Sequence, residues 1–204
     1  MHTAQKLRKE NIAEYILYLW QLEDLLRALS FRPKTIFEQL VAPRTDLDEL
    51  SQQEMLMWYM DIVNLLREEG KAESGHLEHT MHLIGDMNNL HLQLLQFPIG
   101  KHYKSIYSGV ESELPSLKER LGRSDMSDVE LFFRALYAVV LLRLKNRNQQ
   151  DDTFIQDVTT LILPVVSELT SMYHKVELGK VDLFEGTDQQ ASHLAHCDCR
   201  DHKH

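Results

Sequence analysis

Glycine and proline are scarce in this sequence of 204 residues, which contains 8 glycines and 5 prolines. β-Sandwiches and β-barrels need many turn residues, so this scarcity favours long helices over a turn-rich β fold. The hydrophobic and charged fractions, 43% and 26%, are ordinary for a soluble globular protein and exclude a fully disordered or fibrous chain. A chain of this length can bury one substantial core, so a single domain is expected.

Cysteines, long apolar runs and a secretory signal are also lacking. The two cysteines, Cys197 and Cys199, lie one residue apart near the C-terminus, so the rest of the chain has no disulfide framework. The longest apolar run, 135–142, is too short to span a bilayer, and residues 1–10 do not resemble a signal peptide. We therefore expect a cytoplasmic protein that does not associate with membranes.

Basic residues are fewer than acidic ones. The sequence has 22 Lys and Arg against 31 Asp and Glu, which gives a net charge of −9. A chain with this balance is a poor candidate for binding nucleic acid or anionic lipid through bulk charge. We expect no nucleic-acid partner.

Apolar residues recur every three or four positions through most of the chain, which is the period of an amphipathic helix. Pro115 and Pro164 fall inside periodic stretches, and each should kink its helix or start a new one. Ser51 and Ser127 each begin a Ser-x-x-Glu sequence, which predicts a capping box at a helix start. The predicted helices are 4–29, 34–42, 51–70, 74–97, 101–121, 127–146 and 152–173.

Two segments, 15–29 and 129–144, are apolar on almost every face, so each should contact neighbours on several sides. Connectors between the predicted helices are short, which favours antiparallel neighbours. The sequence therefore predicts an all-α, single-domain antiparallel bundle of about six helices with two central apolar helices. We expect this domain to span residues 1–185, with 174–185 laid over the bundle, and residues 186–204 to form a flexible Cys/His-rich tail.

No catalytic signature can be identified. The sequence has no His-Glu-x-x-His zinc helix, no glycine-rich phosphate loop and no Gly-x-Ser-x-Gly elbow. Only Glu73-Ser-Gly-His76 has the Glu-x-x-His spacing of a di-iron bundle, which requires two such motifs. We assign no catalytic residue. Enzymatic activity stays an open question, and the lack of these motifs favours a non-enzymatic protein.

Asn88 and His91 are predicted to be buried, because they project from the middle of the apolar face of helix 74–97. A buried amide or imidazole without a partner costs about 1–3 kcal/mol. One interpretation is an internal hydrogen-bonded pair that fixes the helix register. The other is a polar spot in an internal cavity, joined by acidic groups such as Glu23 of helix 4–29, where a ligand could bind or react.

A second group of polar residues, His79, His82 and Asp86, falls on the opposite face of helix 74–97. Spacings of three and four residues bring side chains close enough to share a metal ion. That face points to water and offers no outer hydrogen-bond partners to orient the imidazoles. A solvated histidine-rich surface is therefore the preferred interpretation, and a metal site the weaker one.

The predicted tail concentrates metal-ligating side chains. Thiolate and imidazole together select Zn²⁺, Ni²⁺ or Cu⁺. Cys-x-Cys alone is a weak signal, and a disordered tail with incidental metal affinity is the competing interpretation. No cofactor is predicted for the rest of the chain, and the tail is the candidate site for Zn²⁺ or Ni²⁺. The candidate ligands are His193, His196, Cys197, Cys199, His202 and His204.

Four segments carry a resemblance to a known family: Glu10–Tyr15, Trp20–Asp24, Asn88–His91 and Leu136–Lys145. Together they resemble a family of uncharacterised all-helical proteins from Bacteroides-type bacteria, described only as a domain of unknown function. The resemblance covers roughly residues 6–184 and lies in helix faces rather than in catalytic signatures. It implies a single helical domain in the cytoplasm of such a bacterium, and it implies no activity and no functional residue.

Three functions are consistent with the sequence. The first is a non-enzymatic helical protein that acts through protein–protein contacts, as a homodimer or with an unknown protein partner. It is favoured because helices 15–29, 55–66 and 129–144 offer more large apolar residues than one bundle is expected to bury. The second is a metal-binding or metal-sensing protein that uses the tail. The third is an enzyme or small-ligand binder built around Asn88 and His91.

Overall fold

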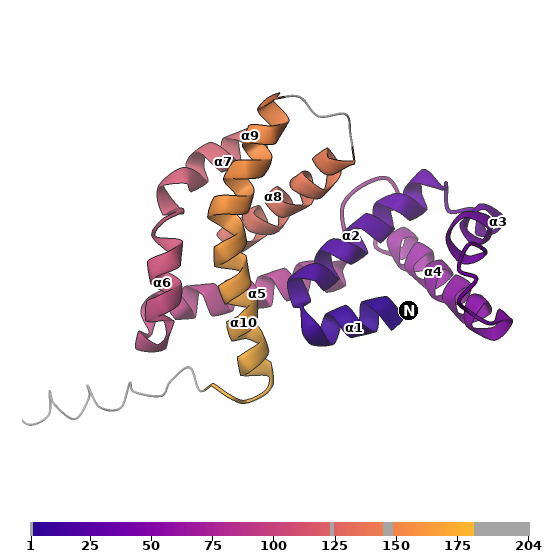
Figure 1. Cartoon of the computed structure of the whole chain (residues 1–204), viewed down its shortest axis with the longest axis horizontal. Helices are drawn as coiled ribbons and strands as arrows, with labels where there is room; N and C mark the ends of the chain where they lie inside the picture. The colour runs from indigo at the N-terminus through magenta and orange to yellow at the C-terminus, as the bar shows by residue number, and fades with distance from the viewer. Residues whose placement is uncertain (1, 123–124, 145–148, 182–204) are drawn as a thin grey trace, which may run out of the picture. The chain divides into compact units, whose positions relative to one another are not determined.

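The computed structural model describes residues 2–122, 125–144 and 149–181. These residues form helices and loops with no strand among them, so the predicted all-α class is confirmed (Figure 1). The antiparallel bundle around two central helices stays a prediction. Contacts within the chain define two compact units, which we describe separately. Of the described residues, the first unit comprises 2–86 and 136–144, and the second comprises 87–122, 125–135 and 149–181.

Six helical elements begin in the first unit, and the second half of a helix that begins in the second unit, α8, joins them. An apolar core forms where α2, α3, η1 and α4 meet, with Leu26, Ile36, Val63 and Leu66 fully buried. The elements are α1 (His2–Glu10), α2 (Ile12–Ala28), α3 (Pro33–Ile36), the π-helix η1 (Phe37–Val41), α4 (Glu49–Glu68), α5 (Glu78–Gln96) and α8 (Asp128–Arg143).

The predicted helix 4–29 is wrong in one respect, because Asn11 divides it into α1 and α2. Asn11 has an extended backbone (φ −154°, ψ 99°), and its side-chain oxygen accepts hydrogen bonds from the amides of Ala13 and Glu14 at 3.1 and 3.3 Å. This is an N-cap, which satisfies amide groups that have no partner within the helix. The break lets α1 fold back and pack against α2.

The two predicted capping boxes have different outcomes. At α4 the prediction is wrong, because the helix begins at Glu49 and Asp48 accepts a 2.9 Å hydrogen bond from the amide of Ser51. At α8 the prediction is confirmed for the serine, since Ser127 Oγ accepts a hydrogen bond from the amide of Glu130 at 3.2 Å. Aspartate and serine are both favourable N-caps, so spacing alone did not distinguish them at α4.

The second unit contains the C-terminal part of α5, the first part of α8 and a series of shorter helices. Within it α6 packs against α10. Pro115 and Pro164 lie in the first turns of α7 and α10, which confirms that each starts a new helix. The shorter elements are the 3₁₀-helix η2 (Pro98–Gly100), α6 (Lys101–Tyr107), the 3₁₀-helix η3 (Glu111–Glu113), α7 (Leu114–Arg120), α9 (Gln149–Asp157), the π-helix η4 (Val158–Ile162) and α10 (Leu163–Glu177).

The C-terminal end of the fold differs from the prediction. Helix α10 continues to Glu177, past the predicted end at residue 173, so 174–177 belong to this helix and not to a separate C-terminal extension. Residues 182–185 of the predicted extension and the whole predicted tail, 186–204, lie outside the described residues. None of the described helices is long and apolar enough to cross a bilayer.

Burial of α8 agrees with the expectation that its segment would be covered on several sides. Leu131, Phe132 and Phe133 are consecutive in the sequence and all fully buried, although consecutive residues point in directions about 100° apart. In contrast, α2 keeps an exposed strip that includes Gln21 and Leu25.

The turn between α5 and α6 contains a glycine, Gly100, at which even one added carbon atom should destabilise the fold. A Cβ at Gly100 would overlap the backbone carbonyl of Leu94, which no side-chain rotation can relieve. We expect Gly100→Ala to lower the free energy of unfolding by about 3 kcal/mol, the cost of a severe overpacking. The matched control is Gly85→Ala within α5, where a Cβ meets nothing within 4 Å, and a gain of about 0.5–1 kcal/mol is expected. Urea unfolding of both variants tests this, and equal stabilities would contradict the structure.

Candidate functional site

Glu23 of α2 carries a carboxylate that is buried in the first unit, with only 1% of the side chain exposed. Its Oε2 lies 2.8 Å from Nδ1 of His76, and its Oε1 accepts a 3.3 Å hydrogen bond from the amide of Leu77. The guanidinium of Arg27, one turn along α2, lies 3.9 Å from Oε2. Burial of an ionised carboxylate is strongly unfavourable unless it is paired, and these groups provide the pairing.

Arg27 connects α2 to the loop that leads into α5. Its guanidinium donates to Asp24 at 2.7 Å, to the carbonyl of Lys71 at 3.0 and 3.2 Å, and to the carbonyl of Gly75 at 2.6 Å. The planar guanidinium has five donors in a fixed geometry, so one side chain can hold several loop carbonyls at once. The loop 71–75 is thereby held against α2.

Aromatic side chains surround the His76–Glu23 pair. The imidazole of His76 stacks on the indole of Trp20, with ring centroids 3.8 Å apart and planes 8° apart. The indole N–H donates to Thr80 Oγ1 at 3.0 Å, and the Tyr137 hydroxyl of α8 donates to the carboxylate of Asp24. Burial, followed by this bond to Asp24, raises the pKa of Tyr137, which keeps the phenol protonated as a donor.

This cluster corrects one expectation and qualifies another. A predicted helix over 74–97 places His76 near its exposed side, together with His79 and His82, but only 9% of the His76 side chain is exposed. Glu23 is buried as predicted, and its partners in the first unit are His76, Leu77 and Arg27 rather than the predicted Asn88 and His91. These contacts hold α2, α5 and α8 of the first unit together.

His91 in the second unit is 1% exposed, as the sequence predicts, but Asn88 is not its partner. Nδ1 of His91 is hydrogen-bonded to the hydroxyl of Tyr103 at 2.6 Å, and its ring lies edge-on to Tyr107. Burial raises the pKa of Tyr103 far above its ordinary value, so the phenol stays protonated. Asn88 is half-buried on the same helix. The predicted pair is therefore replaced by a histidine–tyrosine bond between α5 and α6.

Next to this bond lies a polar contact between α6, α7 and α8. The hydroxyl of Tyr107 donates to Asp128 at 2.8 Å, and Nζ of Lys118 lies 3.0 Å from the other oxygen of the same carboxylate. These three residues border an open depression of about 690 Å³. Because the carboxylate already has two partners, this arrangement joins the three helices.

The buried imidazole of His91 should make stability depend on pH. Burial lowers its pKa below the ordinary value of 6.5, an effect that Asp128 partly offsets. The unfolded chain therefore takes up this proton at a higher pH than the folded chain does. The contribution of His91 to the free energy of unfolding is complete above pH 6.5 and is lost as the pH falls below it.

Replacement of His91 tests this dependence. We expect His91→Gln to lower the free energy of unfolding by about 1–3 kcal/mol at about pH 8, because the bond to Tyr103 is weakened. Between about pH 8 and 5.5, the free energy of unfolding of this variant should fall by less than that of the wild type. The measurement is urea unfolding at both pH values. His102→Gln, an exposed histidine of α6, is the control and should keep the wild-type pH dependence. The assignment fails if His91→Gln retains that dependence too.

A groove of about 630 Å³ opens on the first unit, within the 300–1,000 Å³ typical of binding sites. Its wall combines apolar and aromatic side chains of α2 and α4 with polar and basic side chains of α1. We call it the first-unit groove. It is lined by Ala4, Gln5, Arg8, Lys9, Tyr15, Leu19, Trp58, Ile62, Leu65, Leu77 and His79.

The electrostatics of the first-unit groove are basic on one side. Arg8 and Lys9 come from the last turn of α1, and no carboxylate is among the residues that line the groove. Partial burial lowers the pKa of His79, and the positive charge of Arg8 lowers it further, so the imidazole is neutral at pH 7. The Nε2 atom of His79 is hydrogen-bonded to the Tyr15 hydroxyl at 3.1 Å. An anionic group would be favoured at this side of the groove.

The predicted metal ligands have two outcomes. His79 is engaged with Tyr15, while His82 and Asp86 are exposed on α5. Within 2–122, 125–144 and 149–181, no group of three His, Cys, Asp or Glu side chains could hold a metal ion. The six candidate ligands of the tail lie outside these ranges, so a metal site there stays a prediction.

Sequence reasoning did not identify the first-unit groove or the role of His76. The groove is assembled from α1, α2, α4 and the start of α5, and its existence depends on how these elements pack. One signal was present for His76: a glutamate on the apolar face of α2 requires a cationic or donating partner, although its sequence position gives no indication of which residue supplies it.

Comparison with known proteins identifies one family. The model of a family described as a domain of unknown function (DUF4924) matches residues 1–180. No curated protein and no solved structure matches the chain. The predicted resemblance to an uncharacterised family is thereby confirmed, and the Bacteroides-type origin stays a prediction.

Proposed function

Because the chain belongs to the family described as a domain of unknown function (DUF4924), which carries no assigned activity, we propose a function from the first-unit groove. The protein is a non-enzymatic binding protein that self-associates through protein–protein contacts at this groove. The observation that supports the proposal is a concave surface with an apolar and aromatic floor and a basic side, on a chain with a net charge of −9.

The chemistry of the groove defines its occupant. Trp58, Leu19 and Ile62 offer contact area for an aromatic or aliphatic side chain, and aromatic residues of this kind dominate binding energies at interfaces. Arg8 and Lys9 favour an acidic group beside it. The occupant should therefore be a short segment in which large apolar side chains are flanked by carboxylates.

The sequence contains such a segment shortly after the end of α10 at Glu177. Residues 181–185 read Val-Asp-Leu-Phe-Glu, with two large apolar side chains between two acidic ones. The proposed occupant of the groove is this segment of a second copy. Two such contacts, one in each direction, form a symmetric dimer.

Charge reversal gives a direct test. We expect the full-length wild type to dimerise with a dissociation constant that is roughly micromolar, as for small, transient interfaces. Arg8→Glu/Lys9→Glu should weaken the dimer at least about tenfold, because each groove then repels the acidic segment. Asp182→Lys/Glu185→Lys should do the same from the other side. Sedimentation velocity over a concentration series measures both.

Mixing the two charge-reversed proteins provides the decisive control. Each groove in the mixture then faces a segment of opposite charge, so a heterodimer should form where neither variant dimerises alone. Leu50→Ala on α4 is the matched control, since Leu50 is exposed but does not line the groove, and it should leave the dimer unchanged. A wild type that stays monomeric throughout, or a mixture that stays monomeric, would overturn the proposal.

The donor set of the tail supports metal binding as a second proposal. Four imidazoles and two thiols occur within residues 193–204, the ligand types that Zn²⁺ and Ni²⁺ prefer. Titration of Zn²⁺ into the reduced full-length chain and into a version that ends at Gly186 should give tight binding only in the full-length chain. Equal, weak binding by both would reject it.

A further inference from the structure

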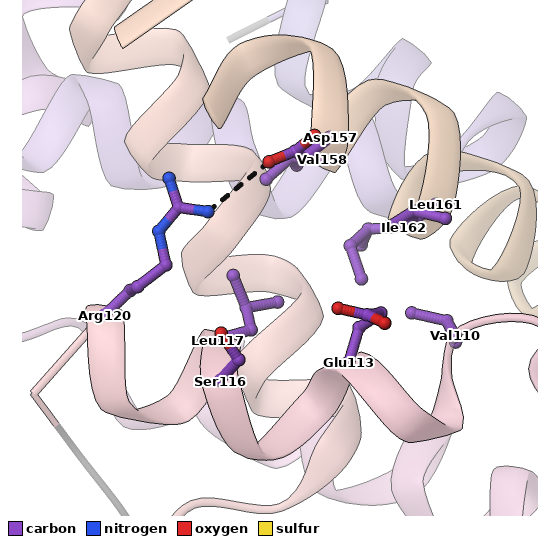
Figure 2. Close-up of a pocket in the computed structure, with 9 residues that line it drawn as sticks. All are labelled: Val110, Glu113, Ser116, Leu117, Arg120, Asp157, Val158, Leu161 and Ile162. Atoms are coloured by element: carbon purple, nitrogen blue, oxygen red, sulfur yellow. Dashed lines mark hydrogen bonds and ion pairs between the residues drawn. The ribbon is translucent and has the colours of Figure 1, made fainter. Parts of the chain in front are cut away.

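The second unit contains a partly enclosed cavity of about 140 Å³ that the proposed function does not use (Figure 2). One side is formed by η3 and α7, and the other by η4. Its walls are mainly aliphatic, and two carboxylates, a hydroxyl and one guanidinium complete them. The residues that line it are Val110, Glu113, Ser116, Leu117, Arg120, Asp157, Val158, Leu161 and Ile162.

The charged side chains around the cavity are not equivalent. Arg120 is engaged, since its guanidinium lies 3.4 Å from Asp157 and stacks over the ring of Phe154 at 4.7 Å. Glu113 is exposed, its carboxylate has no hydrogen-bond or ion-pair partner within the described part of the chain, and Figure 2 shows it pointing toward Ile162. The cavity therefore has at its mouth one exposed carboxylate without a partner among the described residues, beside an aliphatic surface.

The wall opposite Glu113 is a single π-helical stretch, Val158–Ile162, inserted between α9 and α10. Such stretches interrupt the regular α-helical hydrogen-bond pattern and are found frequently at functional sites. Here the stretch supplies three of the aliphatic lining residues, and Asp157 immediately precedes it. An irregular helix and an unpaired carboxylate thus meet at the same cavity.

We propose that this cavity binds a compact organic amine with a branched aliphatic body. The ammonium group pairs with the Glu113 carboxylate, and the aliphatic body contacts Leu117 and Ile162. The size agrees, because 140 Å³ corresponds to about five water molecules at about 30 Å³ each, which suits a body of about five carbons. An anion is disfavoured, since Arg120 is already paired with Asp157.

The test uses three probes that share one body: 3-methylbutylamine, 3-methylbutanol and 3-methylbutanoate. Each is titrated into the isotope-labelled full-length protein and followed by amide chemical shifts. We expect the amine to bind with a dissociation constant on the order of 1 mM, as suits a ligand of so few atoms, and to shift amides in 110–120 and 157–162. The alcohol should bind at least about tenfold more weakly, because its hydroxyl can donate to Glu113 but carries no positive charge to pair with the carboxylate. The carboxylate should bind at least as weakly as the alcohol, because it has no donor and carries the same charge as Glu113.

Two variants separate the site from general charge effects. Glu113→Gln should weaken amine binding about tenfold and change alcohol binding by much less, since only the amine loses an ion pair. Glu111→Gln removes the other exposed carboxylate of the same 3₁₀-helix, which does not line the cavity, and it should bind the amine like the wild type. Equal affinity for amine and alcohol, unchanged binding by Glu113→Gln, or shifts confined to other residues would each overturn the proposal.

Discussion

The first unit depends on the burial of a single carboxylate. Glu23 lies on the apolar side of α2, where an ionised group is tolerated only with close partners. His76 and the amide of Leu77 supply them, so the start of α5 is fixed relative to α2. Leu77 and His79, at the same start of α5, line the first-unit groove. The shape of the proposed binding surface therefore depends on the pairing of Glu23 with His76 and the Leu77 amide.

Local patterns in the sequence were sufficient for the fold class and for several helix boundaries. Helical periodicity predicts the all-α class, and Pro115 and Pro164 mark new helices because proline is accommodated in a first helical turn. Asn11 was missed for a physical reason: the apolar period continues across it, and only its side-chain bonds to Ala13 and Glu14 reveal the break.

The candidate sites were predictable only in part, because their contacts join residues that are distant in the sequence. Periodicity correctly placed His91 in the core, but its partner Tyr103 lies on another helix, α6. Because Tyr103 has the same helical spacing as the other apolar residues of α6, the sequence did not single it out as the partner. His76 and Glu23 are separated by 53 positions. A single sequence shows which side chains turn inward, whereas the gap that becomes a groove arises from packing between helices.

The stacking of Trp20 on His76 has an optical consequence. The chain has two tryptophans, and the second, Trp58, lines the first-unit groove. One indole is fully buried against an imidazole and donates to Thr80, while the other is half-buried at an open surface. Their fluorescence therefore originates in two different environments, so emission at shorter wavelengths reports on the interior of the first unit and emission at longer wavelengths on its groove.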